Sequence, residues 1–182
     1  MYFPEKLTVA WLQNAYGAGD ITPGQVAEEV VRRAEQYMDY RVWITPPDFA
    51  KIKRYIDRLP PNMSPEYPLW GIPFAVKDNI DLEGVPTTAG CPDYEYTPTE
   101  SATVVQKLID AGAVPIGKTN MDQFATGLVG TRSPYGECQN ALHPELISGG
   151  SSSGSAVCVA LGMTAFSLGT DTAGSGRVPA AL

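Results

Sequence analysis

The first third of the chain carries apolar residues at helical spacing, separated by capping signals. At the second predicted helix, Thr22 can cap the helix, Pro23 suits its first position and Gln25 completes a capping box. The pattern therefore predicts a helical scaffold region over residues 1–65. Its expected elements are helices over residues 7–16, 22–37 and 48–59 and a strand over residues 42–44.

In residues 66–182, short apolar runs alternate with amphipathic or glycine-bounded helical segments. The alternation predicts an α/β domain. Asn120 is expected to cap a helical turn, and a glycine-serine loop to open a buried helix. The expected strands cover residues 71–76, 113–116 and 165–169, and the expected helices cover residues 101–111, 121–128 and the apolar run after residue 153.

The last residues, VPAAL, are apolar and resemble the first turn of a helix, whereas chain ends are usually polar and exposed. We therefore expect this region to be truncated at its C-terminal end, so that the chain is part of a longer protein.

Composition narrows the classes of function. The chain has 182 residues and a net charge of -7, and it has no lysine-arginine run, which argues against nucleic-acid binding. No apolar segment reaches the roughly 18 residues of a membrane span, and no signal peptide is recognisable, so a cytoplasmic protein is expected. Three widely spaced cysteines and one histidine predict neither disulfides nor a metal site.

The stretch GAVPIGKT, residues 112–119, matches the phosphate-binding pattern G-x-x-x-x-G-K-[ST]. A phosphate loop follows a strand and opens a helix, but Gly112 follows a predicted helix and the residues after it resemble a strand. Pro115 also removes a backbone N–H that could hold phosphate. Nucleotide binding through Lys118 is therefore the weaker interpretation.

Two loops place serine beside glycine at predicted element boundaries, at residues 149–155 and 171–176. They could be a linker and a turn, but together they bracket one helix-strand unit, which favours a built site. Serine needs a base to become a nucleophile. His143, the only histidine, has no obvious orienting acid, whereas Lys77 ends an apolar strand, where burial would favour the neutral amine.

Four stretches occur in a characteristic order: GIPFAVKDNI, GAVPIGKTNMDQFATG, SGGSSSGSAVCVALG and LGTDTAGSGRVPAAL. With them the chain resembles the amidase signature family from about residue 70 to its last residue. The resemblance implies a mixed β-sheet core surrounded by helices, with residues 66–182 as a catalytic core that is truncated at its C-terminal end. It also implies that Lys77 is the base, that Ser151, entered through a cis peptide bond, is a bridging serine, and that Ser175 is the nucleophile.

In this family resemblance, the backbone N–H groups over Thr172, Ala173 and Gly174 would bind the oxyanion of the intermediate, together with that of the nucleophile. Ala125 and Gly127 lie in a stretch that borders the substrate in family members, although simple helix packing would explain them equally well. No metal and no organic cofactor is implied for this part of the family fold.

The nucleophile loop, residues 171–177, has the sequence DTAGSGR, with Ala173 and Gly176 as variant residues. This variant resembles the allophanate hydrolase branch of the family. That resemblance implies hydrolysis of urea-1-carboxylate, a small-molecule amide, a functional link to urea carboxylase, and a homodimer for the full-length form. Asp171 and Arg177 would brace the loop rather than react. Two alternatives stay open: another amidase, such as the amidase component of a glutamine amidotransferase, and an inert truncated fragment.

Overall fold

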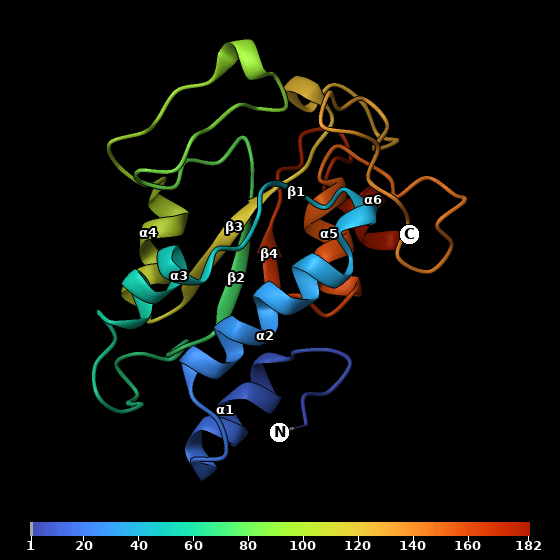
Figure 1. The fold of residues 1–182 in the computed structure, drawn as a ribbon. Helices are drawn as coiled ribbons and strands as arrows, with labels where there is room; N and C mark the ends of the chain where they lie inside the picture. Colours follow the sequence, from blue (N-terminus) through green and yellow to red (C-terminus); the bar gives the residue numbers. More distant parts are fainter. Residues whose placement is uncertain (1) are drawn as a thin grey trace.

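A computed structural model describes residues 2–182. Helices flank a small central sheet (Figure 1). The helices are α1 (Val9–Ala18), α2 (Pro23–Gln36), α3 (Phe49–Ile56), α4 (Thr103–Asp110), α5 (Ser153–Ala160) and α6 (Arg177–Ala181). The strands are β1 (Trp43–Thr45), β2 (Pro73–Lys77), β3 (Val114–Thr119) and β4 (Phe166–Leu168).

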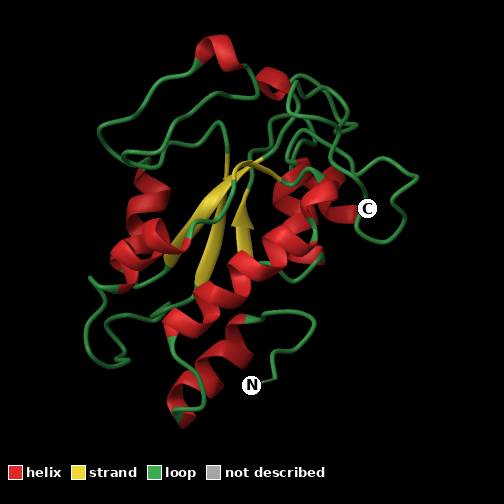
Figure 2. Ribbon diagram, in the orientation of Figure 1, coloured by secondary structure: helices red, strands yellow, loops and turns green. Residues whose placement is uncertain are grey.

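The strand order is β1-β3-β2-β4, and the sheet is mixed (Figure 2). β2 pairs in parallel with both β3 and β4, whereas β1 is antiparallel to β3. Parallel pairs need crossover connections, and the segments containing α4 and α5 supply them. The α/β class with a mixed sheet, expected from the sequence, is confirmed.

Both faces of the sheet are buried, so β2 is an uninterrupted apolar run up to its final lysine. Successive side chains of a strand point to opposite faces. Ala75 accordingly joins the cluster that includes Leu12 of α1, Val30 of α2 and Val157 of α5. Phe74 and Val76 join a second cluster on the α4 side. Residues from 1–65 and from 66–182 thus contribute to one shared hydrophobic cluster.

The parallel strands β2, β3 and β4 end at the same edge of the sheet, because their pairing is parallel. In open α/β sheets, ligands bind beyond the carboxyl ends of the strands. Lys77 ends β2, Asp122 and Thr170 lie in the segments that follow β3 and β4, and the N-terminus of α5 lies beside them. The candidate site therefore forms where the topology brings distant loops together.

The capping box of α2 is confirmed: Thr22 Oγ1 accepts from the Gln25 N–H at 3.3 Å, and Gln25 Oε1 accepts from the Thr22 N–H at 2.9 Å. The expected end of the first helix at Gly17 is wrong, because α1 continues to a left-handed cap at Gly19, φ 74°. The expected helix over residues 121–128 is also wrong. Only Gln123–Ala125 form one 3-10 turn, since Phe124 adopts φ 51°.

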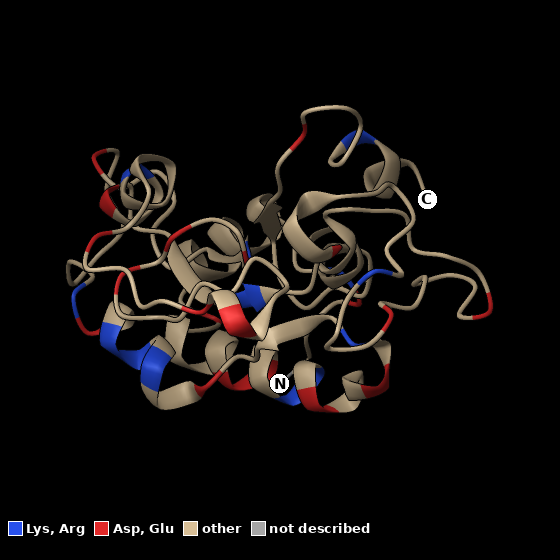
Figure 3. Ribbon diagram, turned by 90° about the horizontal axis from the view of Figure 1, so that it is seen from above, with Lys and Arg blue, Asp and Glu red and all other residues tan. Residues whose placement is uncertain are grey.

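Charged residues are distributed rather than gathered. In Figure 3, basic and acidic residues are scattered over helices and loops, and the charges of residues 2–182 form no continuous basic stripe in this view. Within the same part of the chain, none of the helices has the length and apolar character needed to cross a bilayer.

Candidate active site

Lys77 and Ser151 meet although 74 residues separate them in the chain. Lys77 is the last residue of β2, and its side chain is fully buried. Its Nζ lies 2.8 Å from Ser151 Oγ and 2.7 Å from Thr170 Oγ1, and it donates to both. Asn79 Nδ2 also donates to Thr170 Oγ1, at 3.3 Å. Sequence reasoning missed Thr170, although its position directly after β4 was a usable signal.

Burial lowers the pKa of the Lys77 ammonium to about 8, because the charged form loses its hydration. The negative charges of Asp122 and Asp171 act in the opposite direction and limit the fall of this pKa. Near neutral pH, a usable fraction of Lys77 is therefore the neutral amine, which can accept a proton from Ser151. The direction of this shift agrees with the expectation that burial favours the neutral amine of Lys77.

The segment that carries Ser151 leads directly into α5. The peptide bond between Gly150 and Ser151 is cis, as the family resemblance implied. The Ser151 carbonyl accepts from the Asp122 N–H at 3.2 Å, and the Ser152 N–H donates to the Ser175 carbonyl at 3.0 Å. The backbone of this segment is thus fixed between the segment after β3 and the loop of Ser175.

Ser175 lies in the loop between β4 and α6, and only 6% of the residue is exposed. Its backbone contacts Ser152, but its hydroxyl makes no hydrogen bond with any of residues 2–182. Asp171 braces this loop, as expected. Its carboxylate accepts from the N–H groups of Gly174 at 2.8 Å and Gly176 at 3.2 Å, and it pairs with the Arg177 guanidinium at 2.9 Å. Arg177 and these N–H groups hold the pKa of Asp171 well below its usual range.

The three backbone N–H groups expected to form an oxyanion hole, those of residues 172–174, differ in whether they already donate a hydrogen bond. The Gly174 N–H already donates to Asp171, so it is engaged in bracing the loop. Among residues 2–182, the N–H groups of Thr172 and Ala173 have no hydrogen-bond acceptor. Those two groups, in an exposed turn, can still receive a ligand oxygen.

Ala125 and Gly127 lie in an irregular segment beside the site. Ala125 has φ 58°, and a side chain on Gly127 would come within 3.3 Å of Asp122 Oδ2. Leu128, the next residue, accepts at its carbonyl from the Gly150 N–H at 2.8 Å. The segment therefore runs along the backbone of Ser151, and a substrate-binding role for Ala125 and Gly127 stays a prediction.

Lys118, the lysine of the phosphate-loop pattern, lies within β3 and is fully buried. Its Nζ is 3.8 Å from Asp78 Oδ1 and donates to Thr87 Oγ1 at 3.0 Å. Gly112 ends the preceding helical segment with φ 89°. A phosphate loop needs flexible backbone followed by a helix, so this geometry rules out the pattern as a nucleotide site.

His143 does have an acidic neighbour, which the sequence did not indicate. Its Nδ1 lies 3.3 Å from Glu145 Oε1, but both side chains are about two-thirds exposed. The pair belongs to a surface loop and makes no hydrogen bond with Ser151 or Ser175 within residues 2–182.

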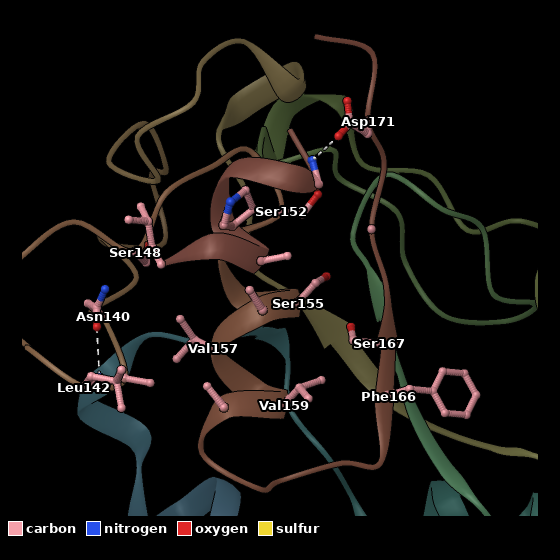
Figure 4. Close-up of a pocket in the computed structure, with 18 of the residues that line it drawn as sticks. Asn140, Leu142, Ser148, Ser152, Ser155, Val157, Val159, Phe166, Ser167 and Asp171 are labelled. Atoms are coloured by element: carbon pink, nitrogen blue, oxygen red, sulfur yellow. Dashed lines mark hydrogen bonds between the residues drawn. The ribbon is translucent and has the colours of Figure 1, made fainter. Parts of the chain in front are cut away.

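A pocket of about 650 Å³ opens between α5 and β4 (Figure 4). Its wall combines Ser152, Thr170 and Asp171 at one end with Val157, Val159 and other apolar side chains further along. Among the described residues, Lys77, Ser151 and Ser175 do not line it. The pocket adjoins the lysine-serine pair rather than containing it.

A family model described as Amidase matches residues 25–182. The chain belongs to the amidase signature family. It is 64% identical over 115 residues to urea amidolyase of Saccharomyces cerevisiae, and the aligned region covers 63% of this chain and 6% of that protein. It is 42% identical over 180 residues to the A component of the Glutamyl-tRNA(Gln) amidotransferase of Chloroflexus aurantiacus, covering 97% of this chain and 37% of that one.

Among solved structures, the Kluyveromyces lactis allophanate hydrolase superposes with a TM-score of 0.81 and 46% identity. The superposition covers 96% of this chain and 29% of that one. The amidase is thus related to the allophanate hydrolase part of urea amidolyases, and it spans well under half the length of these relatives.

Proposed function

We propose that the chain carries the catalytic residues of an amide hydrolase, with Ser175 as nucleophile, Ser151 as bridging serine and Lys77 as base. The observation that carries the proposal is the buried contact of 2.8 Å between Lys77 Nζ and Ser151 Oγ. A buried lysine without a carboxylate within ion-pair distance has no structural need for its charge, but it is well suited to accept a proton.

The proposed reaction moves two protons toward Lys77. Neutral Lys77 takes the proton of Ser151, Ser151 takes that of Ser175, and Ser175 Oγ forms a bond to the amide carbon. The tetrahedral intermediate collapses with cleavage of the carbon–nitrogen bond, and the relay returns a proton to the departing nitrogen, which leaves as ammonia. Water then hydrolyses the acyl-enzyme, with the same relay accepting its proton.

The N–H groups of Thr172, Ala173 and Ser175 are the proposed donors to the oxyanion, and that of Gly174 would contribute only after leaving Asp171. Such donors act because they are already oriented before charge develops on the oxygen. Ala125 and Gly127 are the proposed substrate-side contacts.

Allophanate, urea-1-carboxylate, is the proposed substrate. The products would be ammonia and a carbamate-type species that loses carbon dioxide. Similarity to urea amidolyase and to a solved allophanate hydrolase supports this choice, as do Ala173 and Gly176 in the nucleophile loop. A urea carboxylase would then supply the substrate, and a homodimer is proposed for a longer form.

Ammonia release from allophanate, glutamine and simple amides tests the proposal, with Ser175→Ala as the inactive variant. Release from allophanate that is lost in Ser175→Ala supports it. Release from glutamine alone would favour the amidotransferase alternative, which the similarity to the Chloroflexus aurantiacus protein makes the second candidate. Labelling of Ser175 by a fluorophosphonate separates an assembled site from an inert fragment.

A further inference from the structure

Asp122 is a fully buried carboxylate that follows β3 and takes no part in the proposed proton relay. Its Oδ1 accepts from the Arg132 N–H at 2.8 Å, and its Oδ2 accepts from the Gly130 N–H at 3.1 Å. The carboxylate thus closes the turn that contains residues 123–131. A buried charge is expensive unless hydrogen bonds satisfy it, and these two N–H donors each satisfy one carboxylate oxygen of Asp122.

The turn that Asp122 closes reaches Ser151 from two directions. The Asp122 N–H donates to the Ser151 carbonyl at 3.2 Å, and the Leu128 carbonyl, within the turn, accepts from the Gly150 N–H at 2.8 Å. The carboxylate also lies directly against Gly150, where an added methyl group would collide with Asp122 Oδ2. Asp122 therefore holds the Ser151 side of the Gly150–Ser151 peptide bond directly, and the turn that it closes holds the Gly150 side through Leu128.

We propose that Asp122 is a positioning residue of this site, which fixes the Ser151 backbone against Lys77. The inference rests on the proposed roles of Lys77, Ser151 and Ser175. Asp122 itself contacts neither the substrate carbonyl nor the nucleophile.

The charge of Asp122 has a measurable consequence. Asp122 and Asp171 are the two anionic groups whose charges raise the pKa of Lys77. The neighbouring Asp78 is paired with Lys118 and accepts from Thr88. Removing the Asp122 charge should lower the pKa of Lys77 further, because the ammonium loses a stabilising anion. The base would then become neutral at a lower pH.

The test is the rate of Ser175 labelling by a fluorophosphonate across pH, in the wild type and in Asp122→Asn. The variant is expected to label about tenfold to a hundredfold more slowly, as for loss of a group that orients a catalytic residue. Its pH midpoint should lie below that of the wild type. Asp57→Asn, on an exposed ion pair with Lys53, removes the same charge far from the site and should change neither quantity.

A midpoint does not depend on how many molecules are active, so partial misfolding cannot imitate the shift. A wild-type midpoint or a wild-type rate in Asp122→Asn would overturn the inference. If circular dichroism shows that Asp122→Asn does not fold, Asp122→Glu is tested in its place. Slower labelling of Ser175 at an unchanged pH midpoint then supports the inference, and labelling at the wild-type rate refutes it. If the wild type itself is not labelled at Ser175, the proposed function fails first, which is a separate result.

Discussion

Replacing Lys118 by methionine tests whether the lysine of the phosphate-loop pattern is structural. Methionine keeps an unbranched side chain of similar length in the core, so the substitution removes the ammonium without opening a large cavity. It deprives Thr87 Oγ1 and the Pro86 carbonyl of their donor, at 3.0 and 3.3 Å. It also leaves the buried Asp78 carboxylate without its cationic partner.

The expected cost follows from these contacts. Removing one member of a buried ion pair typically costs about 3–5 kcal/mol of unfolding free energy. Asp78 Oδ2 keeps its bonds from the Thr88 N–H and Thr88 Oγ1, at 3.0 and 2.7 Å, whereas Oδ1 has only the ion pair at 3.8 Å. The lower end applies, because half of the carboxylate stays satisfied. We expect a loss of about 3 kcal/mol, or roughly 6–12 °C in the melting temperature for a domain of this size.

Urea unfolding followed by circular dichroism measures this loss, with an unchanged m value as the sign that only stability has changed. Lys53→Met is the matched control. Lys53 and its partner Asp57 are more than half exposed, so that ion pair should contribute less than about 1 kcal/mol. The structural account of Lys118 would be refuted if the two variants lost the same stability. If ATP protected Lys118 of the wild type against an acylating reagent, that result would also contradict the structural account of Lys118.

Two further predictions concern the pH dependence and the sheet. The rate of Ser175 labelling should be low at pH 6, rise through about pH 8 and then level off. The reason is that Lys77 acts as the neutral amine and its pKa is lowered to about 8. A labelling rate independent of pH between 6 and 9 would exclude Lys77 as the base. Gly117→Ala should cost about 1–3 kcal/mol of unfolding free energy, because its methyl group would lie 2.6 Å from the Thr45 carbonyl and push β1 away from β3. Gly17→Ala, with open space around the added methyl group, should instead stabilise α1, and thermal melting of the two variants distinguishes the outcomes.

Local signals in the sequence predicted the elements whose causes are local. The α2 start was predictable because Thr22 and Gln25 satisfy each other's backbone within one turn. The extent of β3 was not, since the expected strand ended at Ile116 but pairing with β1 and β2 continues it to Thr119. Pairing partners lie far away in the chain, so a window of neighbouring residues does not contain them.

The residues of the candidate site also differ in whether the sequence could indicate them. The contact between Lys77 and Ser151 could be expected because both residues occupy motifs with a recognisable order, whereas the role of Ser175 stays a prediction. Thr170 and Asp122 were missed because their importance arises from where β4 and β3 end in space. The lysine-serine contact is visible in the sequence as two motifs, but the groups that orient it appear only once the strands are side by side.

The separation between Lys77 and Ser151 also has a consequence for synthesis and folding. A contact that closes 74 residues of chain forms late, because loop closure and parallel strand pairing must precede it. A ribosome has to release residue 175 from its exit tunnel before the proposed relay can form at all. If the relay acts as proposed, the emerging polypeptide stays chemically inert toward amides until its sheet has assembled, and a serine-directed label would report the moment at which the sheet is complete.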